Sequence, residues 1–146
     1  MILFFYGADE YRSRAHMRKT VDAFKIKRDP NGHSTHIFDA TKDESSEILN
    51  ALSTGGFFAE KKMVVLLHFL KSKNEELQDA IKEQIKNDKI GDETALLFWE
   101  GDIKYSGKLF ELLKSQKFVQ EFALLTRPQC VGWVIERARE QGITIT

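Results

Sequence analysis

The sequence has little cysteine, little proline and no net charge. Its 146 residues include one cysteine, Cys130, and two prolines. A single cysteine excludes an intrachain disulfide framework and a thiolate cluster for zinc, and it favours a reducing compartment. Lys plus Arg and Asp plus Glu both number 22. The zero formal charge argues against a general nucleic-acid binder, although it leaves room for a local basic patch.

Long hydrophobic runs are also missing. The apolar start of the chain, Met1 to Tyr6, is too short for a membrane-spanning helix, and it lacks the basic front end of a signal peptide. We therefore predict a cytoplasmic protein that has no membrane partner.

Alternation of apolar runs with amphipathic segments is the main positive signal. Hydrophobic residues make up 42% of the chain and charged residues 30%, which suits one folded domain. Continuous apolar runs of this kind are typical of parallel sheets buried on both faces. The pattern predicts a three-layer α/β fold, in which a parallel five-stranded sheet carries helices on both faces. Strands are predicted at 2–6, 34–38, 63–67, 94–99 and 118–122, the second of them at the sheet edge.

Polar residues before several apolar segments predict where the helices begin. Thr41-Lys42-Asp43-Glu44 and Ser72-Lys73-Asn74-Glu75 both read as capping boxes. Ser106 and Thr126 are predicted to cap the two later helices. In the last helix, Val131, Val134, Ile135 and Ala138 fall at i, i+3, i+4 and i+7, which is the spacing of one apolar helix face.

The loop after the first strand is where a nucleotide site would lie in such a fold. A P-loop needs a second glycine and a lysine, but Gly7 is followed by Arg12 and Ser13 at those places. Asp9 and Glu10 add negative charge where phosphates would bind. The third strand also ends without a magnesium-binding carboxylate. Nucleotide hydrolysis is therefore disfavoured, and a degenerate P-loop ATPase is kept as an alternative.

Other catalytic or metal-binding patterns are weak. Asp9 and Asp39 near strand ends leave open a receiver-like regulatory domain, although helix capping explains such residues more simply. His33 and His36 point to opposite faces of a strand and cannot share a metal in regular geometry. Glu100 and Asp102 follow the fourth strand without an evident partner. We predict no cofactor, metal or catalytic residue.

The segment Gly55-Gly56-Phe57-Phe58-Ala59-Glu60-Lys61-Lys62 is the most unusual part of the chain. Turns normally hold small polar residues, so two adjacent phenylalanines there either enter the core or wait for a partner. Burial of both rings in a partner's pocket would contribute roughly 3–6 kcal/mol. Lys61 and Lys62 are most simply read as solvated lysines.

Several motifs, in their order and spacing, resemble the N-terminal domain of the delta subunit of the bacterial DNA polymerase III clamp loader. The similarity covers essentially all 146 residues. Its motifs are Gly7-x-Asp9-Glu10-Tyr11, Phe57-Phe58-Ala59-Glu60-Lys61-Lys62 before a Val/Leu strand, Leu109-Phe110, Phe118-Val119-Gln120-Glu121-Phe122, Trp133-Val134 and Arg137-Ala138.

This resemblance implies an AAA+-like fold without a working ATP site, in a subunit that is not itself an enzyme although its parent complex has DNA polymerase activity. It implies a hydrophobic pair, here Phe57 and Phe58, that grips the beta sliding clamp and helps to open the ring. Lys61 and Lys62 would lie at the rim of that contact. Further implied partners are the delta prime and gamma/tau subunits and, through the complex, primer-template DNA. The family's lid and C-terminal oligomerisation domains are expected to lie outside residues 1–146.

Overall fold

The computed structural model describes residues 1–53, 61–102, 104 and 106–145. Strands and helices alternate along this part of the chain, as the sequence predicts. None of the described helices is long and apolar enough to cross a bilayer. The elements are β1 (Ile2–Tyr6), α1 (Glu10–Arg28), β2 (Thr35–Asp39), α2 (Ser45–Ser53), β3 (Lys62–Leu67), α3 (Glu75–Lys86), β4 (Thr94–Trp99), α4 (Lys108–Lys114), β5 (Phe118–Glu121) and α5 (Arg127–Glu140).

The five strands form one parallel sheet in the order β2-β3-β4-β1-β5. The interior strands are β3, β4 and β1, of which β3 and β4 are almost wholly buried, whereas β2 and β5 lie at the edges and are partly exposed. The predicted parallel five-stranded sheet is confirmed, as is the edge position of the second strand. All carboxyl ends of the strands meet at one edge of the sheet, where such folds place ligands.

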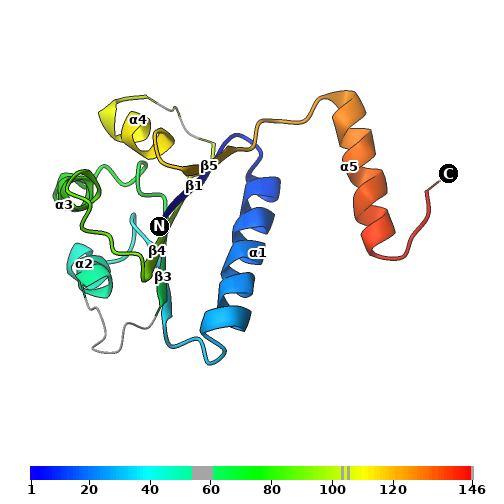
Figure 1. The fold of residues 1–146 in the computed structure, drawn as a ribbon. Coiled ribbons are helices and arrows are strands. Elements are labelled where there is room, and N and C mark those ends of the chain that lie inside the picture. Colours follow the sequence, from blue (N-terminus) through cyan, green and yellow to red (C-terminus); the bar gives the residue numbers. More distant parts are fainter. Residues whose placement is uncertain (54–60, 103, 105, 146) are drawn as a thin grey trace.

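Alternate residues of each strand enter two separate cores, one on each face of the sheet. On one face, helices α2, α3 and α4 bury the larger cluster, and on the other α1 covers the smaller one (Figure 1). Phe4, Leu66 and Phe98 belong to the first cluster. Their strand neighbours Phe5 and Trp99 belong to the second.

Three of the predicted helix starts are wrong, because neighbouring residues provide the cap. α2 begins at Ser45, beyond the predicted box, and the Thr41 hydroxyl donates to Asp39 instead. Asn74 rather than Ser72 caps α3 through a bond from the Leu77 amide. For α4 the cap is Gly107, which has no side chain to contribute. The capping box formed by Thr126 and Gln129 at α5 is confirmed.

Helix α5 does not pack on the sheet as the sequence predicts. It lies beyond α1, away from the sheet (Figure 1), and none of its residues is buried. Val131 and Val134, which belong to the predicted apolar face of this helix, are 56% and 44% exposed. A helical period shows that one side of a helix is apolar, but it does not show that this chain supplies the surface that covers it.

Candidate partner-binding site

The segment that the sequence marks as unusual connects α2 to β3. Phe57 and Phe58 lie outside the described residues, so their predicted role in binding stays a prediction. The described chain resumes at Lys61, whose side chain is exposed. Lys61 therefore occupies a position from which it can meet a partner.

Lys62 begins β3, and its side chain is turned inward. Only 9% of the residue is exposed, and Nζ donates to the carbonyl oxygens of Ala51 and Leu52 at 2.8 and 2.9 Å. Burial lowers the pKa of Lys62, although nearby Glu93 raises it. The expectation of a solvated lysine is thus wrong for Lys62. A cation near a helix C-terminus offsets the negative end of the helix and satisfies carbonyls that have no intrahelical donor.

Replacing Lys62 by methionine is expected to lower the free energy of unfolding by about 1–2 kcal/mol. The substitution keeps the apolar stem and removes the donor from the two α2 carbonyls. Urea denaturation followed by circular dichroism measures the loss. Lys61→Met is the matched control, and its change should stay within about 0.5 kcal/mol because Lys61 is exposed. Equal losses in the two variants would show that the buried contacts of Lys62 contribute nothing.

A shallow pocket of about 300 Å³ adjoins this junction at the amino-terminal edge of the sheet. Lys27 and Arg28 from the end of α1 line it together with Lys61. Asp92 and Glu93, which also line it, provide opposite charge. Apolar side chains such as Leu3, Phe24 and Met63 make up most of the remaining lining, so this pocket is an apolar hollow with charges of both signs rather than a site with one strong charge.

The loop between β1 and α1 is filled by the protein's own groups. Gly7 has φ of +135°, and a Cβ at this position would lie 2.3 Å from the Phe122 carbonyl oxygen. The Asp9 amide donates to that same oxygen at 2.9 Å, and the Asp9 carboxylate accepts from the Arg12 amide and guanidinium. Phosphate-binding loops instead leave their amides open to the ligand. This geometry disfavours the alternative of a degenerate ATPase.

Glu100 follows β4 and is fully buried at the carboxyl-terminal edge of the sheet. Its Oε1 accepts a 2.6 Å hydrogen bond from the Leu70 amide, in the turn that follows β3. Burial raises the pKa of Glu100 to about 7, although backbone amides of that turn lower it. Glu100 therefore fastens the β3–α3 connection to β4. Sequence reasoning saw the carboxylate but missed its partner, because backbone amides leave no mark in a sequence.

Asp39 is the last residue of β2, and His68 directly follows the neighbouring strand β3. Burial raises the pKa of Asp39, but hydrogen bonds from the Thr41 hydroxyl and amide lower it overall. His68 has φ of 59°, and its ring meets Trp99 edge-on at 5.2 Å. Burial lowers the pKa of His68. Both side chains thus serve local structure. Among the described residues, no three His, Cys, Asp or Glu side chains gather as metal ligands.

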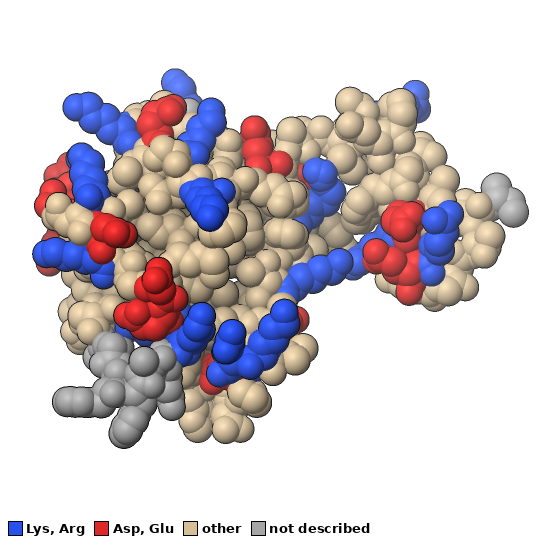
Figure 2. All heavy atoms as spheres, in the orientation of Figure 1, with Lys and Arg blue, Asp and Glu red and all other residues tan. Residues whose placement is uncertain are grey.

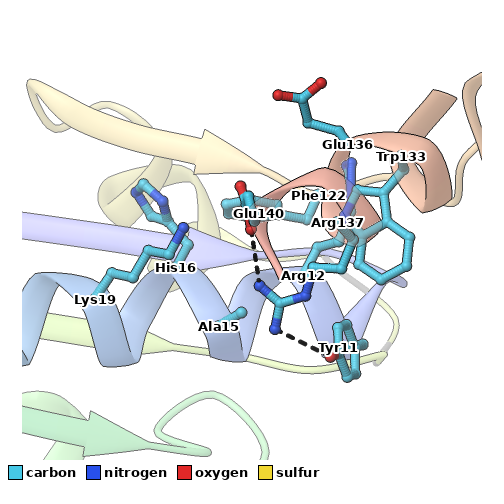
Figure 3. A pocket seen from close by; sticks show the side chains of 10 residues that line it. All are labelled: Tyr11, Arg12, Ala15, His16, Lys19, Phe122, Trp133, Glu136, Arg137 and Glu140. Carbon is cyan, nitrogen blue, oxygen red and sulfur yellow. Dashed lines mark hydrogen bonds and ion pairs between the residues drawn. The ribbon is translucent and has the colours of Figure 1, made fainter. Parts of the chain in front are cut away.

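A cleft of about 280 Å³ separates α5 from α1 (Figure 3). Trp133 meets Tyr11 edge-on at 5.6 Å, and Arg137 bridges the Tyr11 hydroxyl and the Glu140 carboxylate. Arg12, which also lines the cleft, is paired with Asp9. Arg12 and Arg137 are thus both paired with acidic side chains of the same chain. The contacts of Trp133 and Arg137 with Tyr11 hold α5 beside α1, and among the described residues that line the cleft no nucleophile is paired with a base.

Taken together, the geometry defines a parallel α/β domain in which Lys61, just before β3, is exposed. A family model for "DNA polymerase III, delta subunit" matches residues 3–123. The chain belongs to this family, and the resemblance found in the sequence is confirmed.

A solved structure supports the assignment at the level of the fold. It is the Bacillus subtilis DNA clamp loader delta protein (YqeN), which is 18% identical and superposes with a TM-score of 0.64. The match covers 99% of this chain and 44% of the other, so the chain spans less than half the length of that relative. A comparison with curated proteins gave no match.

Proposed function

We propose that this chain is the sliding-clamp-binding and ring-opening domain of a bacterial DNA polymerase III clamp loader, acting in DNA replication. The family match over residues 3–123 carries the proposal. The similar Bacillus subtilis structure, described as a DNA clamp loader delta protein, supports it through the shared fold.

In this proposal Phe57 and Phe58 enter an apolar pocket on the beta clamp and supply most of the affinity. Lys61 lies at the rim, where its charge affects orientation and the rate of association more than affinity. Lys62 acts indirectly, because its amine holds the end of α2 to the start of β3. The two ends of the binding segment are then anchored at a fixed separation, which reduces the entropy lost on binding.

The domain works without catalysis of its own in this proposal. The closed β1–α1 loop favours this reading, since Gly7 and Asp9 pack against the Phe122 backbone. The full-length protein would add lid and oligomerisation domains beyond these residues. It would assemble there with delta prime and gamma/tau subunits and reach primer-template DNA through the complex.

Ring opening can be tested by following the release of a labelled beta clamp from nicked circular DNA. We expect this chain to accelerate release without any added nucleotide, because binding energy alone stabilises the open ring. Gel filtration separates free clamp from clamp on DNA. Unchanged release at a concentration of chain that saturates the clamp would refute the ring-opening role.

A further inference from the structure

Helix α1 is strongly basic, although the whole chain has no net charge. Figure 2 shows Lys and Arg side chains gathered over the lower part of this helix. The basic residues of α1 are Arg12, Arg14, Arg18, Lys19, Lys25, Lys27 and Arg28, and its acidic residues are Glu10 and Asp22.

Arg14, Arg18, Lys25 and Arg28 form a row along one side of α1. At 3.6 residues per turn these positions fall within about 80° of the helix circumference and extend over about 21 Å of its axis. Arg14 lies over the Trp99 ring at 4.3 Å, so the row runs along the side of α1 that is turned toward β4. The other flank of the helix packs toward β1 and β5.

No ion pair joins this row to an acidic side chain among the described residues, although Arg28 lines the same pocket as Asp92 and Glu93. Among the described residues, the ion pairs join Arg12 to Asp9, Arg137 to Glu140 and Arg139 to Glu136. Asp22 lies beside the row on the helix surface, but no ion pair connects it to Arg18 or Lys25. Arg18 and Arg28 are exposed, whereas Arg14 and Lys25 are half-buried.

We propose that the row of Arg14, Arg18, Lys25 and Arg28, called the α1 basic row, binds the phosphate backbone of duplex DNA directly. A line of cations over about 21 Å matches a ligand whose charges repeat along an axis, as phosphates do. Arginine's planar fork suits phosphate oxygens, and cation–π contact with Trp99 fixes Arg14 before binding. Membership of a DNA polymerase III family favours DNA over an acidic protein as the partner.

Binding of this kind is independent of base sequence and sensitive to salt. If all four side chains contact phosphates, the plot of log affinity against log salt should have a slope of about −3 to −4. Fluorescence anisotropy of a labelled duplex of arbitrary sequence, titrated with the whole chain at several salt concentrations, measures both affinity and slope.

The charge-reversal variant Arg18→Glu/Lys25→Glu should bind the duplex about tenfold more weakly or worse, with a slope reduced by about two. Lys82→Glu/Lys86→Glu, which makes the same change in charge on α3 across the sheet, is the matched control and should bind almost like wild type. Circular dichroism of both variants verifies folding.

Equal weakening by the two variants would refute the α1 basic row, because it would show that only total charge matters. Loss of clamp binding in Arg18→Glu/Lys25→Glu with unchanged DNA affinity would also refute it and would indicate an acidic protein partner. The proposed function is tested separately, since replacing Phe57 and Phe58 should leave DNA affinity unchanged.

Discussion

The double variant Phe57→Ala/Phe58→Ala is expected to bind the beta clamp about two to four powers of ten more weakly than the wild-type chain. Each benzyl side chain contributes roughly 1.5–3 kcal/mol when it moves from water into an apolar pocket. At about 1.4 kcal/mol per power of ten, the two rings together give this range. Isothermal titration with the beta clamp of the same organism measures the difference.

The matched control is a double variant that removes two exposed apolar side chains from other parts of the surface. Ile26 and Leu124 are 78% and 70% exposed, and they lie on α1 and on the connection from β5 to α5. Ile26→Ala/Leu124→Ala should leave clamp affinity within about threefold of wild type, because scattered surface hydrophobics are not interface anchors. If both double variants bind the clamp as tightly as wild type, Phe57 and Phe58 are not the contact.

Protonation of Glu100 is expected to change stability by about 3 kcal/mol between acidic and alkaline pH. Its pKa is about 7 in the folded chain, against an ordinary value of 4.5. The folded state therefore holds the proton more tightly than the unfolded state between these two values. The free energy of unfolding should fall as pH rises from 4.5 through 7, by about 1.4 kcal/mol for each unit of pKa difference.

Glu100→Gln isolates this effect. Glutamine keeps an acceptor for the Leu70 amide but has no charge to bury, so its stability should lack this component of the pH dependence. His16 and His68 have pKa values lowered by burial, and they contribute stability that increases with pH in both proteins. The quantity to compare is thus the difference in the free energy of unfolding between wild type and Glu100→Gln, measured by urea denaturation at each pH. A difference that stays constant from pH 4.5 to 8 would contradict the raised pKa of Glu100.

The sheet could be predicted because its strands are marked by composition. Residues 63–67 and 95–99 are apolar throughout, and this pattern occurs where both faces of a strand are covered. Alternation with amphipathic segments then fixes the parallel class, because each crossover needs a helix to cover the sheet. The order of the strands needed the structure.

Contacts made by buried polar groups could not be predicted. Lys62 binds the end of a helix eleven residues earlier in the chain, and Glu100 binds an amide thirty residues earlier. Neither partner is a side chain, so no pattern of residue types records the pairing. The surroundings of α5 escaped prediction for a related reason, because the apolar residues Val131 and Val134 do not reveal whether this chain covers them.

Direct titration of the wild-type chain with the beta clamp tests the central claim most simply. We expect saturable binding by these residues alone, in the absence of nucleotide and of every other clamp-loader subunit. If the full-length protein binds the clamp and this chain shows no binding under the same conditions, the clamp-binding site lies elsewhere in the protein. The proposed function of this chain is then wrong.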